Sequence, residues 1–514
     1  MNETFDVVVA GAGPVGLMLA CELGLAGVNV LVVERLAEID PTVKAGGINV
    51  PTAQALYRRG LLPDLLAEQA KAFEAMGMFL ASRSRSINPE QPTDASNRPP
   101  FAGHFAGIML DIDLIDLDHS SFAHLGPAAE VYLVSQQSIE AVLGRRAAEL
   151  GITVRRGVEL TDFVDDGNGV TVRVGDNTIR AGWLVGCDGG RSLVRKRAGF
   201  DFPGLGPELT GHQAIVEMTG AEGLIPGWTT TDTGMYAHIP APGRILTVEL
   251  DGGPTDRNAP VTAAELQASL RAVSGVPVEI TAVHSATRFT DNTRQVTEYR
   301  RGRVLLAGDA AHVHSPFGGQ GLNLGVGDAV NLGWKLAAVV RGWAKTDLLD
   351  TYTTERHPIG AWVLDWTRAQ VALMRTDKRS RELRTVMTEL LATRDGASTV
   401  FRKISGVLHR YDLGGGHDLV GGAVPDLELS DGTRIGEHFI DGGAVLFDLG
   451  DSAELRAVAG PWSSRTRVVT AKPVEPGELT AMLVRPDGFV AWAADGGNQD
   501  GLEAALTRWF GAAT

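Results

Sequence analysis

Residues 303–336 read RVLLAGDAAHVHSPFGGQGLNLGVGDAVNLGWKL and place an acidic turn, a glycine-rich loop and a helix start in direct succession. The apolar run 304–307 predicts a buried strand, and Asp309 follows it in a Gly-Asp turn. Loop 316–321 lacks side chains at three positions, so its backbone can approach a flat ligand closely. A helix predicted from about Leu322 presents open N–H groups that favour negative charge. Together these features predict a site for an anionic or electron-rich group.

Residues 5–35 carry the residue types of a dinucleotide-binding turn. A β-branched strand runs into Gly11-Ala12-Gly13-Pro14-Val15-Gly16, and an apolar helix and a second strand follow. The first glycine permits a tight bend, the second lets a pyrophosphate approach, and the third lets helix and strand pack closely. Glu34 ends the second strand, where its carboxylate can accept hydrogen bonds from an adenosine ribose. Only one such unit occurs, so FAD and NAD cannot both be bound by Rossmann units.

The composition is that of a globular protein with several domains. The chain has 514 residues, too many for one ordinary core, so two or three domains are expected. A net charge of −15 disfavours nucleic acid as a partner, because phosphate binding needs clustered Lys and Arg. The cysteines Cys21 and Cys187 predict small core residues and a reducing compartment rather than a disulfide scaffold. The N-terminus lacks a signal-peptide pattern, and no apolar run is long enough to span a membrane. We therefore expect a cytoplasmic protein without membrane association.

The remaining elements predict a second and a third domain. Residues 200–285 alternate apolar and polar positions between Gly and Pro, which indicates an antiparallel sheet without Rossmann helices. Residues 84–104 are polar and proline-rich and predict a long irregular loop or lid. Residues 344–395 are expected to be helical. A last unit, 400–514, combines strands, a hairpin and a terminal helix, and it contains no cysteine.

Four segments occur in the order found in a known enzyme family: GAGPVG (11–16) with Glu34-Arg35, Gln136 at a helix entry, CDGGRS (187–192), and GDAAHVHSPFGGQGLN (308–323). In these segments the chain resembles the single-component, FAD-dependent aromatic hydroxylases built like para-hydroxybenzoate hydroxylase. It is most similar to the bacterial branch that includes angucycline-type polyketide hydroxylases and rifampicin monooxygenase. The resemblance spans nearly the whole chain.

The resemblance implies an α/β fold with a Rossmann-like FAD-binding domain, an inserted antiparallel-sheet substrate domain and a C-terminal thioredoxin-like domain lacking active cysteines. The expected divisions are 1–75, 105–200 and 285–395 for the FAD-binding domain, 76–104 and 201–284 for the substrate-binding domain, and 400–514 for the C-terminal domain.

The resemblance also implies which residues bind FAD. Asp309 would contact the ribityl and pyrophosphate part, and loop 316–323 would line the isoalloxazine ring. Gln136 would contact the flavin, and Asp188 belongs to a motif associated with both FAD and nicotinamide. The residues implied to bind FAD are Gly11, Gly13, Pro14, Val15, Gly16, Glu34, Arg35, Lys44, Gln136, Asp188, Asp309, Pro316, Gly319, Gly321, Leu322 and Asn323.

The chain departs from the family pattern in the loop that follows the second strand. Relatives usually carry arginine where this chain has Lys44 and again where it has Pro51. Lysine keeps the charge but loses the bidentate fork of the guanidinium. The departure therefore concerns the details of the contact that this loop makes with pyrophosphate or NADPH.

No side chain is assigned as a catalytic acid or base, and no metal site is predicted. Pro316 and Phe317 are candidates for the face of the flavin. Strand residues that could face the substrate pocket are Met235, Tyr236, His238 and Phe289. Packing and backbone hydrogen bonds are the expected roles of His312 and His314.

The implied activity is aromatic hydroxylation with tightly bound FAD and with NADPH or NADH as a transient reductant. Reduced flavin would react with O2, and the resulting C4a-hydroperoxide would transfer oxygen to a polycyclic, polyketide-type aromatic substrate in a pocket that excludes water. Baeyer–Villiger oxygenation and oxidative inactivation of an antibiotic are alternatives. A flavin reductase without oxygen transfer and a drug-sequestering binding protein are further alternatives. The protein is expected to be a monomer or homodimer.

Overall fold

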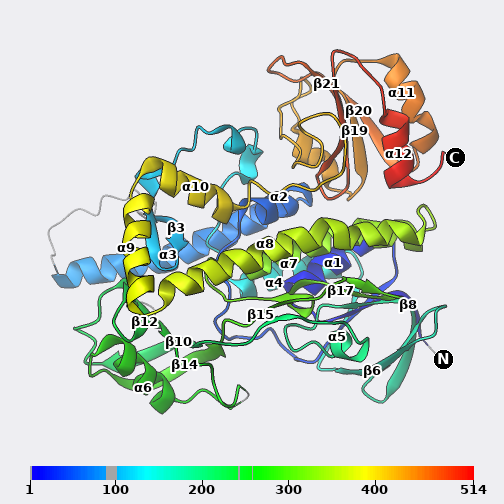
Figure 1. Ribbon diagram of the computed structural model, residues 1–514. Coiled ribbons are helices and arrows are strands. Elements are labelled where there is room, and N and C mark those ends of the chain that lie inside the picture. The colour runs from blue at the N-terminus through cyan, green and yellow to red at the C-terminus, as the bar shows by residue number, and fades with distance from the viewer. Residues whose placement is uncertain (1–2, 88–100, 241–242, 258, 514) are drawn as a thin grey trace.

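Residues 3–87, 101–240, 243–257 and 259–513 are described by a computed structural model of the chain, which contains three large sheets (Figure 1). The largest has eight strands in the order β16-β17-β8-β1-β2-β5, with β7 and β6 continuing from β8. β1 lies parallel between β2 and β8, and β17 is parallel to β8, so the carboxyl ends of these strands share one edge. The strands are β1 (Thr4–Ala10), β2 (Val30–Glu34), β5 (Thr153–Arg156), β6 (Leu160–Asp165), β7 (Val170–Val174), β8 (Asn177–Gly186), β16 (Arg300–Arg301) and β17 (Val304–Leu306).

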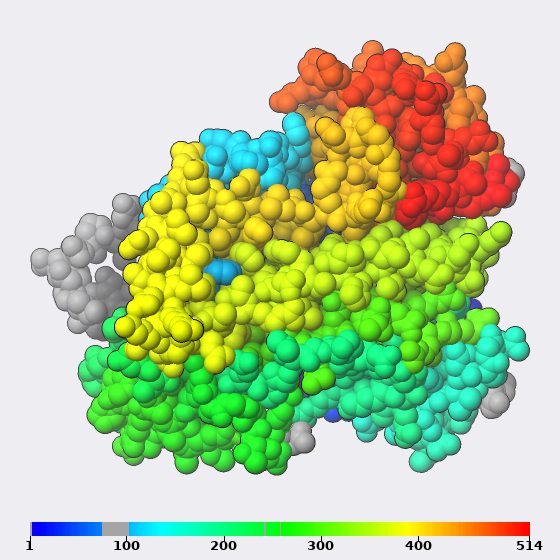
Figure 2. Space-filling model, viewed as in Figure 1, coloured from blue at the N-terminus to red at the C-terminus, as the bar shows by residue number. Residues whose placement is uncertain are grey.

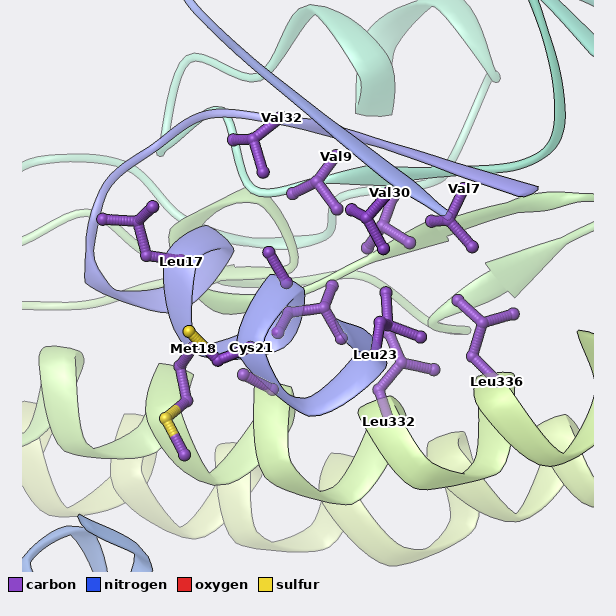
Figure 3. Packing of buried hydrophobic residues seen from close by; sticks show 14 of the residues in the cluster. Val7, Val9, Leu17, Met18, Cys21, Leu23, Val30, Val32, Leu332 and Leu336 are labelled. Carbon is purple, nitrogen blue, oxygen red and sulfur yellow. The ribbon is translucent and has the colours of Figure 1, made fainter. Parts of the chain in front are cut away.

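Helix α1 (Pro14–Leu25) is enclosed between the large sheet and helix α7 (Gln320–Val340), and it is apolar except at Glu22, which forms a buried ion pair with Arg59. Figure 3 shows its side chains between valines of β1 and β2 and the leucines of α7, Leu332 and Leu336. Cys21 lies in this core, and burial raises the pKa of its thiol to about 12. It therefore packs as a small apolar residue, as expected.

The second large sheet is antiparallel throughout and has five strands in the order β11-β12-β13-β10-β14. Helix α6 (Ala263–Ser274) covers one of its faces, and the other faces the aromatic residues described below. This arrangement confirms the expected sheet without Rossmann crossovers. The strands are β10 (Thr210–Thr219), β11 (Gly227–Thr230), β12 (Gly234–Ile239), β13 (Arg244–Glu249) and β14 (Glu279–Phe289).

The C-terminal unit has its own four-stranded sheet in the order β20-β19-β21-β22 and lies against α7 and α8 (Asp350–Met374) at one end of the molecule (Figure 2). β19 pairs in parallel with β20 and antiparallel with β21, which gives a mixed sheet flanked by helices. The predicted hairpin and terminal helix are both present. The elements are β19 (Ala444–Asp448), α11 (Ala453–Ala459), β20 (Thr466–Thr470), β21 (Leu479–Val484), β22 (Val490–Asp495) and α12 (Leu502–Phe510).

The segment predicted as a loop at 84–104 differs from that expectation at both of its described ends. Helix α3 (Leu62–Ile87) extends through its first residues, and β3 (Phe101–Phe105) pairs with β4 (Ile108–Asp111) at its end. Residues 88–100 lie outside the described residues. The domain boundary expected at 104/105 falls within this hairpin, which packs against the antiparallel sheet as one piece.

Other helices connect these units, and small strands complete the fold. Residues 344–395 are largely helical as predicted, with a break after Met374. No helix in the described part of the chain combines the length and the apolar character needed to cross a lipid bilayer. The remaining elements are α2 (Val50–Arg58), α4 (Gln136–Glu149), α5 (Leu193–Arg197), β9 (Gly204–Leu205), β15 (Thr293–Gln295), β18 (His312–Val313), α9 (Lys378–Leu391) and α10 (Arg394–Ser405).

Buried charges join the C-terminal unit to the rest of the chain. Arg485, in the turn between β21 and β22, contacts both carboxylate oxygens of Glu355 in α8 at 2.9 and 2.7 Å. Lys335 of α7 contacts the same carboxylate at 2.9 Å, and all three side chains are at most 3% exposed. Burial alone would raise the pKa of Glu355, but Arg485 and Lys335 outweigh it and lower the pKa to about 2. The junction is therefore held by an ionised carboxylate.

Because of this junction, we expect the free energy of unfolding to decrease as the pH falls below 4.5. Because the pKa of Glu355 in the fold lies below its usual 4.5, its ionised form stabilises the fold above pH 4.5, and the stabilisation is lost as the pH falls toward 2. The loss is on the order of 3 kcal/mol. Denaturant unfolding across this pH range should show a steeper acid decline in the native chain than in Glu355→Gln, which is also less stable at neutral pH. Glu503→Gln, an exposed position, serves as the control. Equal slopes in all three proteins would contradict this role.

Candidate functional site

Three of the four sequence motifs meet at the carboxyl edge of the large sheet. Val15 packs against both the acidic turn and α7: a Cβ added to Gly308 would lie 3.1 Å from Val15, and one added to Gly325 would lie 2.5 Å from it. A Cβ on Gly11 would lie 2.3 Å from the carbonyl oxygen of Cys187. The glycine turn thus touches the Asp-Gly-Gly turn and the Gly-Asp turn together. The strand ends of a parallel sheet are the usual place for a ligand in such folds.

Two helices at this edge begin without a side-chain cap. α1 follows Gly13 and α7 follows Gly319, and neither N-terminus has a side chain accepting its free N–H groups. By contrast, Asn49, Ser135 and Thr262 cap α2, α4 and α6. A Cβ at either glycine would meet nothing within 4 Å. The structure therefore keeps open backbone donors and open space together at both positions, which suits a phosphate group or an electron-rich ring.

Asp309 is exposed and faces the start of α7. A Cβ on Gly321 would lie 3.9 Å from Asp309 Oδ1 and 3.5 Å from His314 Nε2. The other ring nitrogen of His314 lies 2.8 Å from the carbonyl oxygen of Ser315. Burial lowers the pKa of His314, which favours its neutral form. The acid Asp309 and the glycine loop therefore lie side by side, as the sequence predicts, and the neutral imidazole of His314 lies next to both.

The loop after β2 connects Gln136 to Asn323. The carbonyl of Ala45 accepts from the backbone N–H of Gln136 at 2.9 Å, and the carbonyl of Gly47 accepts from Asn323 Nδ2 at 3.2 Å. Lys44 forms an ion pair with Asp40 at 2.8 Å. The lysine that replaces the family's arginine is thus held by a neighbouring carboxylate.

The acids predicted at the other two turns differ in their remaining hydrogen-bonding capacity. Glu34 accepts from the backbone N–H groups of Ala12 at 2.8 Å and Leu36 at 2.9 Å, so its carboxylate also fixes the glycine turn. Arg35 beside it is exposed. One oxygen of Asp188 accepts from Leu193 N–H at 2.7 Å, whereas its buried Oδ1 has no hydrogen-bond partner among the described residues. Asp188 therefore holds the start of α5 through one oxygen, while its other oxygen is a buried acceptor.

An aromatic cluster lies beside the glycine loop. Phe317 is 2% exposed, and its ring centroid lies 6.3 Å from that of Trp228 and 6.0 Å from that of Phe289. Met235 belongs to the same cluster, and the rings of Phe105 and Trp366 meet at 4.6 Å. The cluster joins the glycine loop, the antiparallel sheet, the β3–β4 hairpin and α8. Pro316 is exposed next to it.

Tyr236 and His238, predicted as pocket residues, lie on the opposite face of the antiparallel sheet. In β12 they alternate with Met235, and they pair across to residues of β13 that face α6. The hydroxyl of Tyr236 accepts from Ile225 N–H at 3.2 Å. Of the four predicted pocket residues, Met235 and Phe289 therefore share the cluster with Phe317, and Tyr236 and His238 do not.

Sequence reasoning missed the contribution of α8 to the aromatic cluster. Gln370 donates to the carbonyl of Phe317 at 3.3 Å and accepts from Ala106 N–H at 2.9 Å, so it links the glycine loop to the β3–β4 hairpin. The indole Nε1 of Trp366 is buried without a hydrogen-bond partner among the described residues. The available signal was the four-residue spacing of Trp362, Trp366 and Gln370, which places all three on one side of a helix.

These residues fit FAD. Two open helix N-termini and a glycine-lined approach suit the pyrophosphate and the ring system of a dinucleotide, and the carboxylates of Glu34 and Asp309 can accept hydrogen bonds from its hydroxyl groups. Beside the glycine loop, the rings around Phe317 form a packed apolar cluster. Fold and site together define a flavin-dependent oxidoreductase whose second large sheet is antiparallel.

Comparison with known proteins places the chain in a family. Residues 4–367 match the family described as FAD binding domain, and residues 417–513 match the one described as aromatic-ring hydroxylase, C-terminal. The chain belongs to the FAD-dependent aromatic-ring hydroxylases, a family of monooxygenases, which confirms the resemblance drawn from its motifs.

The chain is similar over its whole length to proteins of differing activity. It is 39% identical to a rifampicin monooxygenase of Streptomyces venezuelae over 99% of both chains. It is 37% identical to a dialkyldecalin synthase of Streptomyces rugosporus over 100% of both chains. The solved structure of the anhydrotetracycline hydroxylase OxyS of Streptomyces rimosus superimposes with a TM-score of 0.86 at 39% identity, covering 99% of this chain and 100% of that one. Family membership therefore identifies the cofactor domain and leaves the substrate open.

Proposed function

We propose that this protein is an NAD(P)H- and O2-dependent monooxygenase that hydroxylates a polycyclic aromatic substrate. The observation that carries the proposal is the aromatic cluster around Phe317, directly beside the glycine loop assigned to the flavin ring. Flat apolar rings bind fused aromatic compounds by stacking and edge contacts. The rifampicin monooxygenase and OxyS relatives, both named for large polycyclic antibiotics or their precursors, support the same substrate class.

The balanced reaction converts a substrate C–H, O2, NAD(P)H and a proton into C–OH, water and NAD(P)+. When bound, FAD supplies electron transfer from the nicotinamide and activation of O2. The chain's own residues bind, orient and exclude water. The open N–H groups at the start of α7 would favour negative charge on a bound ring by about 0.3–2 kcal/mol. Phe317, Trp228 and Phe289 would keep water from the reacting ring.

Two alternatives share this machinery. Baeyer–Villiger oxygenation would use the same cofactor and reactants but insert oxygen beside a ketone. Oxidative inactivation of an antibiotic would use the same chemistry on a drug, and the similarity to rifampicin monooxygenase favours it over catabolism. One full-length relative is named a dialkyldecalin synthase and not a monooxygenase. A flavoprotein that transfers no oxygen is therefore the alternative that an experiment must exclude.

We expect the purified protein to be yellow and to consume NAD(P)H severalfold faster when a fused-ring phenol is added. An electron-rich ring accepts oxygen more readily, so the same fused hydrocarbon without its hydroxyl group is the matched control. Product mass spectrometry with fragmentation separates ring hydroxylation from insertion beside a ketone. If no tested polycyclic aromatic raises oxygen uptake over the background, the proposal is wrong.

A further inference from the structure

We propose that Tyr411 and Arg356 are positioning residues through which the C-terminal unit holds the turn Gly308-Asp309. Tyr411 contacts Arg356, Arg356 contacts Asp328, and Asp328 contacts Gly308 and His312 on either side of Asp309. The inference rests on the proposed assignment of this turn to FAD, and it gives the C-terminal unit a part in cofactor binding.

Asp328 holds the Gly308-Asp309 turn in place through one of its carboxylate oxygens. Its Oδ2 accepts from the backbone N–H of Gly308 at 3.1 Å and lies 2.7 Å from His312 Nε2. Both Asp328 and His312 are 0% exposed. Oδ2 of Asp328 therefore contacts both Gly308 and His312, which lie on either side of Asp309. The position of Asp309 depends on where this carboxylate lies.

Arg356 holds the other carboxylate oxygen. Its Nε donates to Asp328 Oδ1 at 2.8 Å, and its Nη2 donates to the carbonyl of Leu324 at 2.9 Å. A Cβ on Gly327 would lie 2.7 Å from the guanidinium, so glycine at that position leaves room for it. Burial alone would raise the pKa of Asp328, but His312 and Arg356 outweigh it and lower the pKa. The carboxylate is therefore ionised and needs both partners.

Tyr411 extends the chain of contacts into the C-terminal unit. Its hydroxyl accepts from Arg356 Nη1 at 3.2 Å. Its ring centroid lies 4.1 Å from that of Phe489, next to β22, and its backbone N–H donates to the carbonyl of Gly421. Tyr411 is thus anchored in the C-terminal unit, while its hydroxyl reaches a residue of α8.

A small cavity borders the contact between Arg356 and Tyr411. The cavity has a volume of about 60 Å³ and is lined by Arg356, Tyr411 and Asn323 among others. This is too small for an aromatic substrate, which needs roughly 300 Å³ or more, but large enough for ordered water. The guanidinium therefore packs against Gly327 on one side and borders a space the size of ordered water on another.

The test is Tyr411→Phe, which removes the hydroxyl and keeps the ring. We expect the dissociation constant of the apoprotein for FAD to rise by about 5- to 20-fold, with a shift in the visible circular dichroism of the bound flavin. The unfolding midpoint of the apoprotein should change no more than in the control. The matched control is Tyr57→Phe, because Tyr57 donates to Asp426 at 3.5 Å across the same junction without touching Asp328 or Arg356.

Weaker FAD binding in Tyr411→Phe with unchanged binding in Tyr57→Phe supports the proposal. Equal effects in the two variants, or none in Tyr411→Phe, would overturn it. Arg356→Lys, which keeps the charge without the fork, should weaken FAD binding more than Tyr411→Phe does. Failure of the underlying assignment is distinguishable, because in that case Asp309→Ala would itself retain FAD.

Discussion

Asp309→Ala is expected to give a folded, largely colourless protein. Asp309 is exposed in the apoprotein and faces the open start of α7, so its removal costs the fold little. A carboxylate that accepts hydrogen bonds from a ribityl chain contributes about 1.5–3 kcal/mol, which corresponds to about 10- to 150-fold weaker FAD binding. FAD titration of the apoprotein measures this loss, and circular dichroism and thermal unfolding verify the fold.

The matched control for Asp309→Ala is Asp176→Ala. Gly175-Asp176 repeats the same dipeptide in an exposed turn between β7 and β8, distant from the carboxyl edge of the sheet. This variant should remain yellow. Full FAD occupancy in Asp309→Ala would remove the assignment of Asp309.

Gly13→Ala is expected to weaken FAD binding without changing the stability of the apoprotein. Gly13 has φ −70° and ψ 177°, values that alanine adopts without strain, and a Cβ there would meet nothing within 4 Å of protein. The added methyl group would occupy the space through which a pyrophosphate approaches the N-terminus of α1. We therefore expect an unchanged unfolding midpoint of the apoprotein together with at least about tenfold weaker FAD binding, a loss comparable to that of one charged hydrogen bond.

The control for this substitution is Gly206→Ala. Its Cβ would also meet nothing within 4 Å, and it lies outside the four motifs. Isothermal titration of both apoproteins with FAD gives the comparison. If Gly13→Ala binds FAD as tightly as Gly206→Ala does, the pyrophosphate does not lie at this turn.

The parts of the site that the sequence predicts are those whose chemistry is local along the chain. The glycine turn at 11–16, the Gly-Asp turn and the start of α7 each place their groups within a few residues, so spacing alone defines them. The start of α7 was predicted two residues late, because Gly319, with φ 63°, ends the loop earlier than the apolar stripe indicates.

The aromatic cluster and the junction could not be predicted because they depend on tertiary contacts. Alternation in β12 shows that Met235 and Tyr236 occupy opposite faces but does not show which face meets the glycine loop. Trp366 reaches the cluster from α8, far along the chain, and the contact between Arg356 and Asp328 joins two helices. The sequence shows that lysine replaces the expected arginine at position 44, but only the structure shows that Lys44 forms an ion pair with Asp40.

The central claim is that this protein transfers one oxygen atom from O2 to a polycyclic aromatic compound. The most direct test incubates the FAD-loaded protein with NADPH, a fused-ring phenol and isotopically labelled O2, and then determines the label in the product by mass spectrometry. We expect one labelled oxygen atom in the product for each NADPH consumed. A product without label, or NADPH consumption that yields only hydrogen peroxide with every polycyclic aromatic tested, would contradict it.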